Sequence, residues 1–232
     1  MAYAFVNSGT FYNNAGTGSA SVSYSATLGN TLLVAAITQT VGSSLTLSDT
    51  ENTYSFLGAT IVEGGFYLNL WEAHVTTGGS LTISLPGGPT YGMYVPEYSG
   101  LATSAYISSS FQSGAQVGPS LGANTITTGS NPNATSAPAM VFALSVNIQA
   151  ISGPNGDPGP SLGTSFSFNS RTVGWLGSSS QQTALAEDIR VTSTGTQAMT
   201  FGCTGNLQFD TALTVAAAFV ESATATSIAW IA

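Results

Sequence analysis

Short runs of alternating apolar and polar residues recur about every ten positions along the chain. The runs are rich in β-branched and aromatic residues, and clusters of Gly, Asn, Asp, Ser or Pro separate them. This period places successive side chains on opposite faces of a β-strand. About a dozen strands are expected, at Ala20–Thr27, Thr31–Thr40, Thr53–Glu63, Phe66–Val75, Ser80–Leu85, Tyr91–Tyr98, Tyr106–Gln112, Ala123–Thr128, Ala139–Asn147, Thr183–Val191, Gln197–Cys203 and Thr211–Glu221.

The residues between these runs predict an antiparallel arrangement. Gly29-Asn30, Gly64-Gly65, Gly78-Gly79 and Gly87-Gly88-Pro89 tolerate the backbone of tight turns, so each predicts a hairpin. Sustained helical periodicity is missing from the sequence, and Leu185–Asp188 is the one place that would allow a helical turn. We therefore predict an all-β fold, an antiparallel β-sandwich.

One domain, 1–232, is expected from the length and the 43% hydrophobic content. The Gly- and Pro-rich segment near 152–163 is interpreted as a long surface loop, because the segments after it resemble core strands of the same sandwich. The runs 32–37 and 213–220 are apolar on both faces. Such strands are covered on both sides, and the second cover is expected to be a loop or a neighbouring subunit.

Charge is scarce, since only 5% of the residues are charged against about 25% in ordinary soluble domains. Arg171 and Arg190 are the only basic residues other than the single histidine, and the formal net charge is −8. Nucleic acids and anionic lipid surfaces require clustered Lys and Arg, so neither is an expected partner. The surface must consist largely of Ser, Thr, Asn and Gly, which allows copies to meet with little charge repulsion.

Groups for catalysis are equally scarce. Cys203 is the only cysteine and His74 the only histidine, and no Gly-x-Ser-x-Gly motif occurs between a strand and a helix. Glu63, Glu72 and Glu97 are the acids on strands, and each is expected to face solvent or to fix a turn. His74 is interpreted as a solvated strand residue beside Glu72. The chain is therefore predicted not to be an enzyme and to carry no organic cofactor.

A calcium site is one hypothesis for the loop at Asp49, Glu51 and Asn52, which places three oxygen-bearing side chains within four positions. Glu187 or Asp188 would join them from another loop. The alternative is a turn in which Asp49 and Asn52 bind the local backbone.

Aromatic rings offer a second hypothesis, a stacking surface for neutral sugars. The candidates are Trp71, Tyr94, Tyr98 and Trp175, with Tyr91 and Tyr106 as further rings. Flat rings contact the apolar faces of sugars, although most aromatics in such a chain belong to the core.

Several short motifs resemble a recurrent family of bacterial and phage-encoded β-sandwich proteins whose role is poorly defined. The resemblance implies a jelly-roll-like sandwich on surface or virion proteins and implies no reaction. It spans most of the chain, in the motifs Gly29–Ala35, Ser48–Tyr54, Leu70–Ala73, Glu97–Leu101, Glu187-Asp188, Ser193–Thr196 and Ala216–Phe219.

These features together predict a non-enzymatic structural or adhesive protein on the outside of a large assembly. A phage virion component, such as a head decoration or a tail-fibre domain, is the first expectation, at the virion surface or outside cells. The alternatives are a carbohydrate-binding module of a cell-surface protein and an extracellular filament subunit that assembles by strand complementation. The expected partners are further copies of the chain, other virion or filament subunits, or a neutral glycan.

Overall fold

The computed structural model describes residues 2–61, 65–117, 125–127, 132–147, 160–161, 169–172, 183–197, 200–203 and 211–223. Sixteen strands lie in these ranges, and every pairing between them is antiparallel. The only helix there is the short 3₁₀ turn η1 (Gly42–Ser44). The predicted all-β sandwich is thus confirmed. Within the same ranges, no helix is long and apolar enough to cross a membrane.

The first half of the chain forms one sheet. Its strand order is β1-β5-β2-β4-β3, and we call it the first sheet. The strands are β1 (Ala4–Ala26), β2 (Thr31–Thr38), β3 (Ser55–Ile61), β4 (Tyr67–His74) and β5 (Gly79–Ser99).

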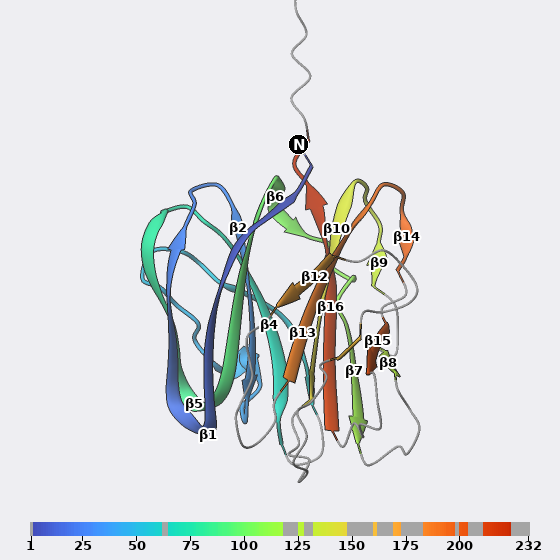
Figure 1. Ribbon diagram of the computed structural model, residues 1–232. Helices are drawn as coiled ribbons and strands as arrows, with labels where there is room; N and C mark the ends of the chain where they lie inside the picture. Colours follow the sequence, from blue (N-terminus) through green and yellow to red (C-terminus); the bar gives the residue numbers. More distant parts are fainter. Residues whose placement is uncertain are drawn as a thin grey trace, which may run out of the picture.

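The second half forms the facing sheet, with the order β12-β13-β10-β16-β6 and β7 also paired to β16; we call it the second sheet. In Figure 1, β2 and β5 lie on the left, and β10, β13 and β16 lie on the right. Its strands are β6 (Leu101–Tyr106), β7 (Gln112–Val117), β10 (Ala139–Asn147), β12 (Asn169–Thr172), β13 (Thr183–Val191) and β16 (Thr211–Glu221).

Two small sheets complete the described strands. The order β11-β15-β8 joins β8 (Thr125–Thr127), β11 (Pro160–Ser161) and β15 (Thr200–Cys203). The pair β14-β9 joins β9 (Asn133–Ala134) and β14 (Gly195–Thr196). Of the predicted loop near 152–163, only the two residues of β11 lie inside the described ranges.

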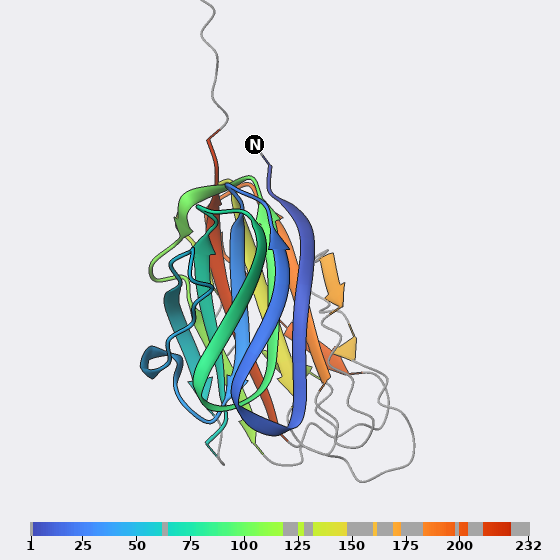
Figure 2. The same ribbon diagram turned by 90° about the vertical axis from the view of Figure 1, so that its left-hand side faces the viewer.

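β1 and β5 are unusually long, because they form a two-stranded ribbon that bends back over the sheet. One half pairs residues 4–12 with 92–99, and the other pairs residues 19–26 with 79–86. We call this second half the outer ribbon. The bend is visible at the lower left of Figure 1, and Figure 2 shows the ribbon in front of the other strands of the first sheet.

The fold has two principal apolar layers. The inner layer lies between the sheets and contains Leu33, Leu70 and Tyr98 from the first sheet with Phe142 and Phe219 from the second. The other layer lies between the first sheet and the outer ribbon. It consists mainly of Ala20, Val22, Tyr24, Leu81, Ile83 and Leu85 of the ribbon against Leu32, Val34, Ala36, Trp71, Met93 and Val95. The second cover of residues 32–37 is therefore the chain's own ribbon, not a loop or a neighbouring subunit.

The turn predictions are partly right. The hairpin predicted at Gly64-Gly65 is confirmed, because the strands on either side of it, β3 and β4, pair antiparallel. Turns occur at Gly29 (φ +86°) and before Gly79 (φ +106°), but the hairpins predicted there are wrong, because β1 does not lie beside β2, and β4 does not lie beside β5, in the strand order. The hairpin predicted at Gly87-Gly88-Pro89 is wrong, because these residues lie within β5, where the ribbon bends. The helical turn allowed at Leu185–Asp188 is also wrong, because these residues pair with both neighbours of β13.

Candidate functional site

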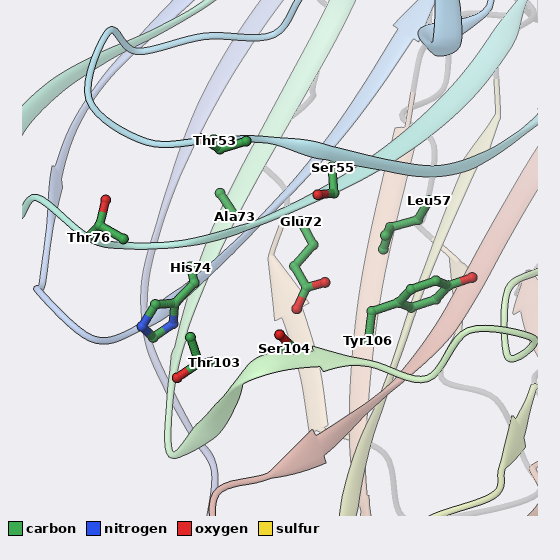
Figure 3. A pocket seen from close by; sticks show the side chains of 10 residues that line it. All are labelled: Thr53, Ser55, Leu57, Glu72, Ala73, His74, Thr76, Thr103, Ser104 and Tyr106. Carbon is green, nitrogen blue, oxygen red and sulfur yellow. The ribbon is translucent and has the colours of Figure 1, made fainter.

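A pocket of about 430 Å³ opens between the first sheet and β6. Strands β3, β4 and β6 and the segments that flank β3 and β4 supply its walls (Figure 3). Hydroxyl groups dominate the lining, and Glu72 and His74 are its only acidic and imidazole side chains. The lining residues are Thr53, Ser55, Leu57, Glu72, Ala73, His74, Thr76, Thr103, Ser104 and Tyr106.

The alternation of β4 explains where the pocket lies. Leu68 and Leu70 point into the layer between the sheets. Glu72 and His74 continue the same face, because every second residue of a strand shares a face. The inner face of β4 thus changes from apolar to polar towards its end, and the polar part borders the pocket. Figure 3 shows Glu72 and His74 projecting from β4 towards β6.

The carboxyl group of Glu72 is largely withdrawn from solvent. Burial raises its pKa to about 7, although hydrogen bonds from the backbone N–H groups of Tyr106 and Ala105 act in the opposite direction. These two donors fix the carboxyl group against β6. Near neutral pH the group therefore exchanges between its protonated and ionised forms, and it can donate or accept a hydrogen bond.

His74 differs from its prediction as a solvated residue. Its side chain is half-buried, and Nδ1 is shielded from solvent without a hydrogen-bond partner in the described structure. A buried polar atom without a partner is costly, so such atoms occur where a water or a ligand supplies the missing contact. The imidazole is therefore the least satisfied polar group of the pocket.

In the loop proposed to bind calcium, both carboxylate oxygens of Asp49 already accept hydrogen bonds. Oδ1 accepts from the backbone N–H groups of Glu51 (2.9 Å) and Asn52 (2.7 Å). Oδ2 accepts from the Asn52 amide (2.9 Å) and from the Tyr54 hydroxyl (2.7 Å). Burial opposes ionisation, but these hydrogen bonds outweigh it and lower the pKa of Asp49. This is the alternative turn, in which Asp49 organises its own loop, and the calcium site stays a prediction.

The acids expected to join that site are used elsewhere. Asp188 accepts hydrogen bonds from Tyr3 (2.8 Å) and Tyr98 (3.0 Å), and Glu187 is fully buried. Among the residues that the structure describes, no group of three or more His, Cys, Asp or Glu side chains is arranged to hold a metal.

The stacking hypothesis is wrong for three of its four rings. Trp71 has 2% of its surface exposed, and Tyr94 and Tyr98 have none. Tyr98 contacts Phe142 across the inner layer, and Trp71 contacts Phe56 on the other side of the first sheet. A ring enclosed by the core presents no face to a sugar. Trp175 lies outside the described residues.

The three glutamates that the sequence places on strands have different outcomes. Glu97 is buried and accepts hydrogen bonds from the Tyr24 hydroxyl, the Thr27 backbone and the Asn30 amide, so it fixes the turn between β1 and β2 as predicted. Glu63 is not among the described residues. Glu72 is the exception, since it lies in the pocket.

Comparison of the chain with family models, with curated proteins and with solved structures found no match. The family resemblance of the sequence motifs is therefore still a prediction.

Sequence reasoning missed the pocket although a signal was present. Glu72 and His74 follow Leu68 and Leu70 at alternate positions, so two polar side chains extend an apolar face. That pattern indicates a strand whose buried face ends at a polar cavity. It does not reveal β6, which supplies the opposite wall from a distant part of the chain.

Proposed function

We propose that this protein is a non-enzymatic structural or adhesive subunit of a larger assembly, joined to neighbouring copies along the outer edge of β1. One observation carries the proposal: residues 20–26 of β1 form a regular and uncharged edge of the first sheet. An exposed strand edge presents backbone groups that can pair with another chain.

The composition of β1 favours pairing. The whole strand, Ala4–Ala26, contains no Asp, Glu, Lys, Arg or Pro. Sheet edges in monomeric proteins are usually protected by charges, proline or bulges. The register shifts of β1 fall between Phe5 and Ser19, and the pairing with β5 is regular from Ser19 to Ala26. This last stretch therefore lacks the usual protection.

The solvent-facing side of the outer ribbon supports the same function. Ser21, Ser23 and Ser25 are exposed, and their cross-strand partners are Ser84, Thr82 and Ser80. The face thus consists of small hydroxyl side chains without charge. Two such faces can approach closely, because no charge repulsion opposes the contact and hydroxyl groups bond to many partners.

The kind of assembly follows from the motif resemblance. Its phage-encoded and bacterial members suggest a virion surface, with a head decoration or a tail-fibre domain as the specific forms. An extracellular filament built by strand addition would use the same edge. Either location suits a net charge of −8, which gives no attraction for nucleic acid.

The test is the molar mass of the purified chain by light scattering over a range of concentrations. We expect the wild type to form oligomers. The variant S21K/S23K should be monomeric, because two charges on the edge strand make pairing with a second edge unfavourable.

The matched control is S80K/T82K, which adds the same two charges to the neighbouring strand on the same face. It should still form oligomers, because this stretch of β5, although it is the second edge of the outer ribbon, is already engaged at Ser84, which exchanges two backbone hydrogen bonds with Ser48. A wild type that is monomeric at every concentration would refute the proposal. Equal loss of association in both variants would show that the contact is not specific to the edge of β1.

A further inference from the structure

The pocket between β4 and β6 has the size of a small-ligand site. Its volume of about 430 Å³ falls in the range of roughly 300–1,000 Å³ that such sites occupy. It is formed by strands of both sheets, so its walls are fixed by the sandwich itself. Leu57, Ala73 and the ring of Tyr106 provide apolar surface between the polar groups.

The polar groups suit a ligand that donates and accepts hydrogen bonds. Thr103 and Ser104 of β6 and Ser55 of β3 are exposed at the pocket, and each hydroxyl can act in both ways. Glu72 lies directly opposite Ser55 in the β3–β4 register. Its carboxyl group faces β6 from the same side of β4 as His74.

His74 sets the strongest requirement. Its Nδ1 has no partner in the described structure and is itself shielded from solvent, so a ligand in the pocket reaches this atom only when the imidazole ring turns. A ligand hydroxyl can donate to the unprotonated nitrogen or accept from the protonated one. An ammonium ion can only donate, and a carboxylate can only accept. A hydroxyl group is thus the partner that can form a hydrogen bond with Nδ1 in either tautomer of the imidazole.

Charge narrows the ligand class further. The pocket holds no Lys or Arg, and its acid would repel an anion. A metal ion would have Glu72 and His74 as its only strong ligands, too few for a protein-held site. A neutral polyhydroxyl compound is not repelled by the acid and needs no strong metal ligands.

We propose that this pocket binds one residue of a neutral sugar, with Glu72, His74, Thr103 and Ser104 as its polar contacts. The proposal does not depend on the edge of β1. Of the rings that the sequence suggested, Tyr106 lines this pocket, whereas Trp71, Tyr94 and Tyr98 are enclosed by the core.

The single histidine of the chain provides a direct readout. The ring C–H signals of His74 can be followed by NMR without ambiguity during titration with D-glucose, D-galactose, N-acetyl-D-glucosamine and glycerol. We expect a saturable shift with at least one of the sugars. D-Glucuronate, titrated in parallel, should give a weaker response because Glu72 repels an anion. Methylammonium should also give a weaker response, because it cannot accept a hydrogen bond and lacks the further hydroxyl groups of a sugar.

Variants then locate the site. Ser104→Trp should abolish the shift, because the large ring fills the pocket from an exposed position of β6, and Thr103→Val should weaken binding about tenfold by removing one hydroxyl. Ser193→Trp, at an exposed position between β13 and β14 that does not line the pocket, is the matched control and should bind as the wild type does. Circular dichroism confirms that each variant is folded.

Three results would overturn the proposal. The first is no saturable shift with any of the neutral compounds. The second is a stronger response to methylammonium or glucuronate than to every sugar. The third is sugar binding by folded Ser104→Trp that equals the wild type. None of these results bears on the oligomeric state, so this proposal and the assembly proposal fail separately.

Discussion

Tyr98 of β5 donates a hydrogen bond of 3.0 Å to Oδ2 of Asp188 in β13, and this contact joins the two sheets across the inner layer. Both residues are fully buried. Tyr3 donates to the other carboxylate oxygen at 2.8 Å. An acid inside the sandwich is thus held by the hydroxyl group of Tyr98 in the opposite sheet and by that of Tyr3, which precedes β1.

The first prediction concerns this contact. Tyr98→Phe keeps the ring but removes a donor from a buried carboxylate, so we expect a loss of about 1–3 kcal/mol in the free energy of unfolding. Urea denaturation measures it. The control Tyr67→Phe, at a half-buried position of β4, should change stability by less than about 0.5 kcal/mol. Equal effects of the two substitutions would contradict the assigned role of Tyr98.

The second prediction concerns the Asp49 loop. In Asp49→Asn, the donors of Glu51, Asn52 and Tyr54 face an amide in place of a carboxylate. We expect this substitution to lower the free energy of unfolding by about 1–3 kcal/mol at neutral pH. The pKa of Asp49 is lowered in the native state. Its contribution is therefore present above the ordinary pKa of an aspartate and is lost as the pH falls through the native value. The gap between variant and wild type should close in acid.

The same loop tests the calcium hypothesis. Because both oxygens of Asp49 are already bonded, we expect the same Tm in millimolar calcium and in a chelator. A higher Tm in calcium that Asp49→Asn abolishes would instead establish the cation site, since a ligand that binds only the native state raises its stability.

The third prediction concerns the pH dependence of stability at Glu72. Its native pKa of about 7 lies above the ordinary value of 4.5, so the native state holds a proton that the unfolded chain releases between these values. The stability from this group is complete below pH 4.5 and is lost as the pH rises to about 7. Between acid and neutral pH, the free energy of unfolding should therefore fall by about 2 kcal/mol less in Glu72→Gln than in the wild type.

Urea midpoints at acid and neutral pH measure the effect. The comparison stays below about pH 8, where Tyr106, whose pKa is raised by burial, is protonated in both proteins. Parallel pH profiles of Glu72→Gln and the wild type would contradict the raised pKa.

The fourth prediction concerns the packing of η1 against the first sheet. A Cβ at Gly42 would lie 2.5 Å from an atom of the Phe56 ring and 2.6 Å from one of the Trp71 ring. Gly42→Ala should therefore lower the free energy of unfolding by about 1–3 kcal/mol, because the buried Trp71 ring cannot move away freely. At Gly18, an added Cβ meets nothing within 4 Å, and Gly18→Ala is the control. Thermal unfolding that is equal for both variants would show that the rings adapt without cost.

Local pattern predicted most of the strands but not how far each extends. Alternation identified residues 20–27, 80–85 and 91–98 as strands. It divided β5 at Gly87-Gly88-Pro89, because these residues are typical of a turn. In the folded chain the ribbon bends there without ending, since the long partner strand β1 runs alongside both parts.

The pocket and the aromatic residues show the same limit. Trp71 and Glu72 are neighbours in sequence, yet Trp71 lies in the layer under the outer ribbon and Glu72 borders the pocket. The sequence places them on opposite faces of a strand but does not say what covers each face. That cover comes from β1, β5 and β6, which are distant along the chain.

The sequence by itself determined the fold class, the absence of clustered cations and the face on which each strand residue lies, because these depend on composition and on a two-residue period. The tertiary structure alone decided that the ribbon covers the first sheet, that Tyr94 and Tyr98 are enclosed and that His74 faces a cavity. The physical reason is that burial depends on which distant strands pack against a face, and this is a property of the whole sandwich.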